Sequence, residues 1–164
     1  AGRPSRMKGI EVLLEAFKHS SAEIKLVLML AKDSREEYER VISFIDENKF
    51  TERVLVIDPV IHADMANYLA MADVVVIPSL TEEFCFMAAE ASSMDLQLIV
   101  SDVGAIPEVV SGKVIFVQPN SAQALAKALE DAADGHFVLI PKKEWNWNST
   151  LAKYEQLYLQ LINS

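Results

Sequence analysis

The sequence predicts an α/β fold, namely a Rossmann-like, doubly wound parallel sheet with helices on both faces. Short runs of valine, isoleucine and leucine recur along the chain, as at residues 25–30, 54–57 and 73–77. Segments of helical length and helical apolar spacing separate these runs. Continuous apolar strands that alternate with helices are typical of a parallel sheet covered on both faces, and right-handed crossovers then wind the chain in two directions.

The first half of the chain alternates between helix and strand from its start. Residues 9–19 have an amphipathic helical pattern, and residues 25–30 form a nearly continuous apolar run that predicts a buried strand. Residues 34–48 predict a long polar helix with a single apolar stripe. A β-branched run at 54–57 predicts the next strand, and residues 62–71 predict the helix after it.

The second half continues this alternation. Its expected strands and helices are, in order, residues 73–77, 84–94, 98–100, 106–110, 114–117, 121–132 and 151–162. Ser121 is a favourable N-cap for the alanine-rich helix that it precedes, and residues 148–150 suit the cap of the last helix. Residues 136–140 fit either an additional strand or a buried loop. We expect Trp145 and Trp147 to anchor the last helix.

Length, charge and cysteine content limit the possible functions. A chain of 164 residues suits one domain, and its net charge of -9 argues against nucleic acid or an anionic membrane as the principal partner. The single cysteine, Cys85, excludes an internal disulfide and fits a reducing compartment. No apolar run approaches the roughly 18 residues of a membrane-spanning helix. The three histidines show no metal-ligand spacing, so no metal site is predicted.

Two cations lie in the loop before the first helix. Arg3 and Lys8 precede the amphipathic segment that begins near Ile10. Positive charges at a helix N-terminus oppose the helix dipole, so helix stability does not explain them. A phosphate group bound between them would, because helix N-termini bind anions through free backbone N–H groups. A solvated basic turn is the simpler alternative.

Two glutamates follow the strand predicted at residues 73–77. Glu82 and Glu90 lie before and within the helix predicted at 84–94, with seven residues between them. In an open parallel sheet, ligands bind beyond the carboxyl ends of the strands, where strand runs into helix. Helix capping alone could also explain such glutamates. Together with Arg3 and Lys8, however, they predict a ligand site at the carboxyl edge of the sheet.

These residues and their order resemble a known family. The matching segments are Gly2-Arg3, Lys8-Gly9, residues 72–79, Glu82, residues 84–91 and residues 101–110. Their succession is similar to the C-terminal, donor-binding half of GT-B glycosyltransferases, in particular the retaining family 4. The resemblance covers nearly the whole chain. It implies a single nucleotide-sugar-binding domain over residues 1–164, a fragment of a longer two-domain enzyme, with a strand expected before Gly2.

The resemblance implies a role for each matching position. Arg3 and Lys8 would bind the diphosphate and stabilise the leaving nucleotide, and Glu82 would meet hydroxyls of the transferred sugar. Glu90 would accept the two ribose hydroxyls. The other donor-binding residues implied are Phe84, Cys85, Phe86 and Met87, through their backbone N–H groups, and Pro59 and Val60 beside the nucleobase.

The activity implied by the resemblance is that of a retaining hexosyltransferase. A UDP-, GDP- or ADP-sugar would be the donor, and neither a metal nor another cofactor would be required. The acceptor, which could be a sugar, a lipid-linked molecule or a protein, would bind the missing N-terminal domain, without which this domain would be inactive. The enzyme would be cytoplasmic, with the missing domain able to hold it at the inner face of a membrane.

Some positions depart from the family pattern. Glu83, Phe84 and Cys85 stand where the family has Gly-Phe-Gly, and a glycine there lets backbone approach a ligand closely. One alternative is therefore a non-catalytic nucleotide-sugar sensor or subunit with a degenerate GT-B site. A second alternative is an unrelated Rossmann-type dinucleotide enzyme, but the Gly-x-Gly-x-x-Gly turn that such an enzyme needs is absent from the sequence.

Overall fold

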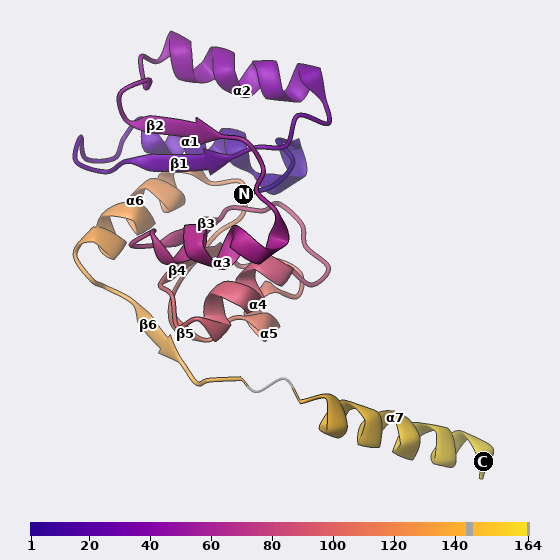
Figure 1. Ribbon diagram of the computed structural model, residues 1–164. Helices are drawn as coiled ribbons and strands as arrows, with labels where there is room; N and C mark the ends of the chain where they lie inside the picture. The colour runs from indigo at the N-terminus through magenta and orange to yellow at the C-terminus, as the bar shows by residue number, and fades with distance from the viewer. Residues whose placement is uncertain (144–145, 164) are drawn as a thin grey trace.

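Helices and strands alternate through an α/β body, from which the last helix projects (Figure 1). The computed structural model describes residues 1–143 and 146–163. The first half contains η1 (Arg6–Lys8), α1 (Ile10–Phe17), β1 (Leu26–Met29), α2 (Arg35–Glu47), β2 (Val54–Ile57) and α3 (His62–Ala70). The second half contains β3 (Val75–Ile77), α4 (Phe86–Ser93), β4 (Leu98–Ser101), α5 (Ile106–Val109), β5 (Gly112–Val117), α6 (Ala122–Ala133), β6 (Val138–Ile140) and α7 (Trp147–Ile162). The predicted alternation is confirmed.

The strands form two hydrogen-bonded sheets, whereas the sequence predicted one. β1 pairs with β2 in parallel, and β3, β4 and β5 form a parallel set to which β6 adds in antiparallel orientation. Gly2 forms an isolated parallel bridge with Leu30 beyond the end of β1, where its N–H donates to the Met29 carbonyl at 2.9 Å. Within the described residues no strand pairs with both β1 and β3, so the ladder is interrupted between them.

The core confirms that helices cover both faces of the sheet. One cluster packs Leu14 and Phe17 of α1 and Leu125 of α6 against the strands, and the other packs residues of α4 and α5. β4 contributes to both clusters, Ile99 to the first and Leu98 to the second, since successive strand residues point to opposite faces. Each large side chain buried in this way stabilises the fold by about 1.5–3 kcal/mol.

The C-terminal part differs most from its prediction. For residues 136–140 the additional strand is confirmed and the buried loop is excluded, because β6 is an exposed edge strand with Leu139 76% exposed. Helix α7 begins at Trp147, four residues before its predicted start, because the Asn146 side chain accepts a hydrogen bond from the N–H of Asn148 at 2.8 Å. Trp147 is 76% exposed and is not packed into the core of the described residues, so the expectation that it anchors the last helix was wrong. The other predicted anchor, Trp145, lies outside the described residues.

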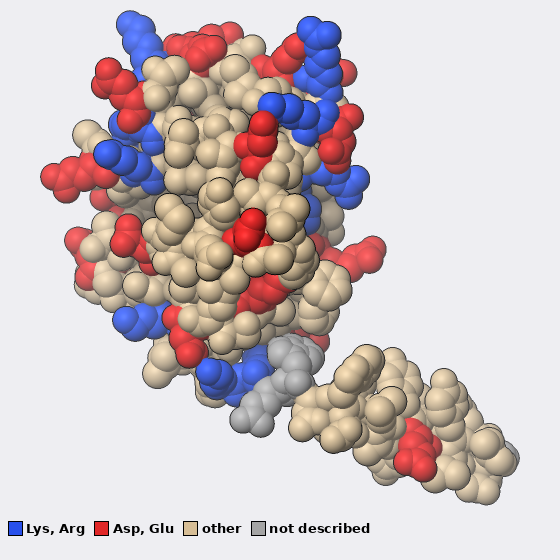
Figure 2. Space-filling model, in the orientation of Figure 1, with Lys and Arg blue, Asp and Glu red and all other residues tan. Residues whose placement is uncertain are grey.

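Charged side chains of both signs are interspersed over the α/β body, whereas the visible surface of α7 is almost free of them (Figure 2). No residue of α7 is buried, and its apolar side chains are exposed. None of the helices in residues 1–143 and 146–163 combines the length and apolar character needed to span a membrane.

Candidate functional site

The loop before α1 is packed against the loop that follows β3. Gly9 ends η1 with φ 68°, and a Cβ on it would lie 1.8 Å from the carbonyl oxygen of Pro78. The N–H of Leu80 donates to the carbonyl of Met7 at 2.8 Å. Because this loop follows the C-terminal end of β3, which pairs in parallel with β4, the contact lies at the carboxyl edge of the sheet, where the sequence predicted the site.

Glu82 is the point at which three loops meet. Its side chain is only 11% exposed, and its carboxylate accepts hydrogen bonds from the ammonium group of Lys8 and from the hydroxyl of Ser79, the latter at 3.0 Å. On the backbone side, the N–H of Ala105 donates to the Glu82 carbonyl at 3.3 Å. A Cβ on Gly104 would lie 1.9 Å from that same carbonyl oxygen. The position of Glu82 is therefore fixed on both sides.

The two predicted phosphate-binding cations differ in their surroundings. Lys8 is paired with Glu82, and its side chain is 40% exposed. Arg3 is exposed and forms no ion pair with the part of the chain that the structure describes. A ligand phosphate can thus reach Arg3 directly, whereas Lys8 has to exchange its carboxylate partner for the ligand.

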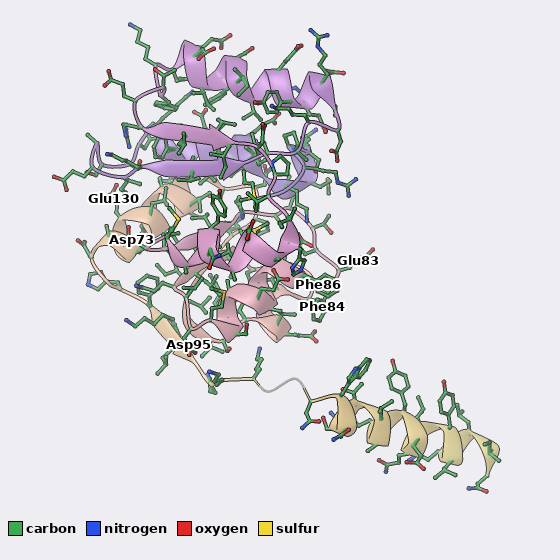
Figure 3. All side chains as sticks on the ribbon, viewed as in Figure 1. Asp73, Glu83, Phe84, Phe86, Asp95 and Glu130 are labelled. Carbon is green, nitrogen blue, oxygen red and sulfur yellow. The ribbon has the colours of Figure 1, made fainter. Side chains whose placement is uncertain are left out.

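Helix α4 begins at Phe86, two residues later than predicted, because Cys85 adopts a left-handed conformation with φ 69°. Cys85 occupies the N-cap position without a side-chain cap hydrogen bond. The rings of Phe84 and Phe86 lie 4.9 Å apart, and Figure 3 shows both beside the start of α4 together with Glu83. Of the first-turn N–H groups, that of Ala88 donates to the Cys85 carbonyl at 3.0 Å, whereas those of Phe86 and Met87 donate to no described residue and are available to an anionic or hydroxyl ligand.

The thiol of Cys85 is packed into the core rather than presented to solvent. Cys85 is 8% exposed and belongs to the cluster that includes Ala88 and Ile106. Burial raises the pKa of the thiol above its ordinary value, and the nearby charge of Glu82 adds to this rise, while the Ala88 N–H and Lys8 oppose it. A thiol with a raised pKa is a poor nucleophile at neutral pH, so a catalytic role for it is disfavoured.

The left-handed backbone at Cys85 leads to a stability prediction. Cys85→Gly and Cys85→Ala both remove the buried thiol, but only glycine adopts φ 69° without strain. We therefore expect the glycine variant to have the larger free energy of unfolding, by roughly 0.5–1 kcal/mol. Urea denaturation followed by circular dichroism measures this difference. Equal stability of the two variants would contradict strain at this position.

Glu90 contacts a residue that the sequence interpretation did not connect with it. The Nε2 atom of His62 lies 3.2 Å from Oε1 of Glu90, and the Glu90 side chain is 36% exposed. His62 is the first residue of α3 and follows the loop that contains Pro59 and Val60. The predicted base-contacting loop and the predicted ribose-binding carboxylate are thereby linked.

The structure brings several predicted residues together but leaves their ligand roles as predictions. Lys8 contacts Glu82, and Phe84 contacts Phe86. The sequence interpretation assigned no site role to the supporting positions Ser79, Gly104 and His62. A signal existed for Ser79, because it lies two residues after the strand that ends at Ile77. For Gly104 the signal was its place in the loop after the next strand, on the same edge of the sheet.

The fold and this edge place the chain among the α/β domains of GT-B type, with which solved structures align closely. Residues 1–134 match the family described as glycosyl transferases group 1. The chain belongs to that family.

Individual relatives are similar over much of this chain but extend well beyond it. D-inositol 3-phosphate glycosyltransferase of Xylanimonas cellulosilytica is 33% identical over 129 residues, which are 78% of this chain and 31% of that protein. One subunit of the human phosphatidylinositol N-acetylglucosaminyltransferase is 30% identical over 117 residues, 65% of this chain and 24% of that protein. This chain therefore spans less than a third of either curated relative.

Solved structures agree with the fold. Sucrose-phosphate synthase from Thermosynechococcus elongatus superposes with a TM-score of 0.78 at 29% identity, over 99% of this chain and 44% of that one. HepE from Anabaena, in a structure with UDP-glucose, superposes with a TM-score of 0.73 at 20% identity, over 82% of this chain and 38% of that one. The likeness to HepE concerns the fold alone.

Proposed function

We propose that the chain is the donor-binding domain of a retaining glycosyltransferase, which transfers a hexosyl group from a nucleotide sugar to an acceptor. The observation that carries the proposal is the meeting of Lys8, Glu82 and the start of α4 at the carboxyl edge of the sheet. Ligands of open α/β sheets bind at this edge. The proposal concerns the whole protein, because sugar transfer and acceptor binding also require its remaining domain.

Donor binding proceeds by an exchange of partners at Lys8. The diphosphate binds the exposed guanidinium of Arg3 and draws the Lys8 ammonium away from Glu82. The Glu82 carboxylate then accepts hydrogen bonds from hydroxyls of the sugar, so that no buried charge is left alone. Both cations are placed to stabilise the negative charge that develops on the departing nucleotide as its bond to the sugar breaks.

The rest of the donor extends along α4 and the loop before α3. The Glu90 carboxylate offers two acceptor oxygens, which suit the two neighbouring ribose hydroxyls. The N–H groups of Phe86 and Met87 donate to phosphate or sugar oxygens. Pro59 and Val60 contact the nucleobase.

We propose UDP, rather than GDP or ADP, as the nucleotide. HepE is described in complexes with UDP and with UDP-glucose. Two relatives are named for transfer to an inositol phosphate or to phosphatidylinositol, so we propose an acceptor of similar chemistry, bound outside residues 1–164. We also propose a cytoplasmic location, with the remainder of the protein at a membrane face, and a reaction that needs no metal.

Calorimetric titration with UDP, GDP and ADP tests the proposal. We expect binding of one nucleotide, unchanged by a metal chelator, and a loss of about 1.5–3 kcal/mol in its binding free energy in Glu90→Ala, since a charge-assisted contact is removed. Glu47→Ala, which removes an exposed carboxylate on α2, is the control and should bind like the unchanged chain. Failure of all three nucleotides to bind at millimolar concentration would overturn the proposal.

A non-catalytic nucleotide-sugar sensor is the second candidate function. The contact between Glu82 and Lys8 favours it, because that contact occupies the carboxylate which the sugar needs. Donor binding is common to both candidates, so it does not separate them. Sugar transfer by the intact protein, measured with a radiolabelled donor, separates them.

A further inference from the structure

We propose that His62 is a positioning residue for the Glu90 carboxylate, and that it thereby sets how strongly the site prefers ribose over 2′-deoxyribose. The inference rests on the proposed function, because it takes Glu90 as the residue that binds the ribose hydroxyls. Its starting observation is the 3.2 Å separation between His62 Nε2 and Glu90 Oε1, which joins the first turn of α3 to the second turn of α4.

The contact with His62 takes up one side of Oε1 only, so both oxygens of Glu90 can still accept from the ribose hydroxyls. Among the described residues, His62 is the one basic side chain within 4 Å of the Glu90 carboxylate, and no side chain there donates a hydrogen bond to it. A rotation of the imidazole ring would align its Nε2–H with Oε1, and that donation is open to the imidazolium form and to one neutral tautomer. The contact therefore does not require a particular charge on His62.

A fixed orientation of Glu90 matters because a diol is a demanding ligand. Two neighbouring hydroxyls donate to one carboxylate only when its plane faces them, and a glutamate side chain that is 36% exposed otherwise samples several rotamers. A contact to Oε1 from the side of α3 restricts this rotation. A nucleotide without its 2′-hydroxyl makes at most one of the two hydrogen bonds. Its affinity therefore depends less on a fixed orientation of the Glu90 side chain.

The position of His62 in the chain couples the ribose to the nucleobase loop. His62 directly follows the loop of residues 58–61, which includes the predicted base contacts Pro59 and Val60. At the start of this loop Asp58 is paired with Lys32 at 2.5 Å, so its carboxylate is already neutralised by another group. The contact between Glu90 and His62, whose side chain is 88% exposed, thus brings the ribose carboxylate next to the end of the base loop.

The test compares the affinities of UDP and 2′-deoxy-UDP, the probes being these two nucleotides, for four forms of the chain. These are the unchanged chain, His62→Ala, Glu90→Ala and the double variant. We expect His62→Ala to weaken UDP about three- to fivefold, in the range of an exposed ion pair, and to leave 2′-deoxy-UDP nearly unchanged. In the Glu90→Ala background the His62→Ala change should have no further effect, because its target is gone.

Two further variants separate positioning from a general structural effect. His62→Gln retains a side-chain N–H of similar reach and should restore the preference for UDP over 2′-deoxy-UDP. His136→Ala removes another exposed histidine and should change neither affinity. Equal weakening of both nucleotides by His62→Ala, or additivity with Glu90→Ala, would overturn this inference alone. Absence of nucleotide binding to the unchanged chain would overturn the proposed function and this inference with it.

Discussion

Gly104→Ala is expected to lower the free energy of unfolding by about 3 kcal/mol, the sum of a backbone overlap and a strained left-handed residue. The added Cβ would lie 1.9 Å from the carbonyl oxygen of Glu82, and φ at Gly104 is +55°. The obstructing atom is backbone, and it also accepts a hydrogen bond from Ala105, so it cannot simply rotate aside. Urea denaturation followed by circular dichroism measures the loss.

Gly135→Ala is the matched control for this prediction. Gly135 also has a positive φ, +78°, but an added Cβ would meet nothing within 4 Å. Its substitution should therefore cost only the conformational part, about 1 kcal/mol. Similar losses in the two variants would show that the backbone at Gly104 can move away from Glu82, and that the loop after β4 does not fix the backbone of Glu82.

The positions of strands and helices along the chain could largely be predicted from the sequence, because they depend on local patterns. The strand at residues 54–57 was predicted with the bounds that it has, since four apolar residues lie between polar turns. The start of α7 was predicted wrongly, because several neighbouring polar residues can cap a helix. The choice of Asn146 follows from backbone geometry that the sequence does not display.

The arrangement of the sheet was only partly predictable. An apolar run indicates a strand but not its partner, because pairing depends on hydrogen bonds between distant segments. The antiparallel direction of β6 and the interruption between β1 and β3 were therefore not foreseen. The covered faces were foreseen, because continuous apolar strands have no other stable arrangement.

The candidate site was likewise predictable where it depends on local sequence patterns, and not where it depends on packing between distant segments. The sequence placed Lys8 and Glu82 at one edge of the sheet, because each lies beside the start of a helix on that edge. Their direct contact, across 74 positions of sequence, depends on how Gly9 and Gly104 let three loops approach one another. The contact between His62 and Glu90 depends likewise on the packing of α3 against α4. No local pattern encodes such distances.

Arg3→Ala is expected to reduce the binding free energy of UDP by about 1.5–3 kcal/mol, with no change in the affinity for uridine. Arg3 is exposed and has no ion-pair partner among the described residues, so its charge is fully available to the diphosphate. Calorimetry with both ligands measures the difference. The UDP affinity of the unchanged chain should also fall more steeply with added salt than that of the variant, because salt screens the charge that Arg3 supplies.

Arg6→Ala and Lys8→Ala identify the origin of this loss. Arg6 lies in the same loop and is exposed, so its removal lowers the general positive charge without removing the predicted contact. We expect Arg6→Ala to bind UDP almost normally, and equal losses in Arg3→Ala and Arg6→Ala would refute a specific phosphate site.

Lys8→Ala should weaken UDP binding and also destabilise the fold, because it leaves the largely buried Glu82 carboxylate with Ser79 alone. Arg3→Ala should leave stability unchanged. An exchange of partners at Lys8 requires a particular pattern. Arg3→Ala loses UDP affinity alone, whereas Lys8→Ala loses both UDP affinity and stability.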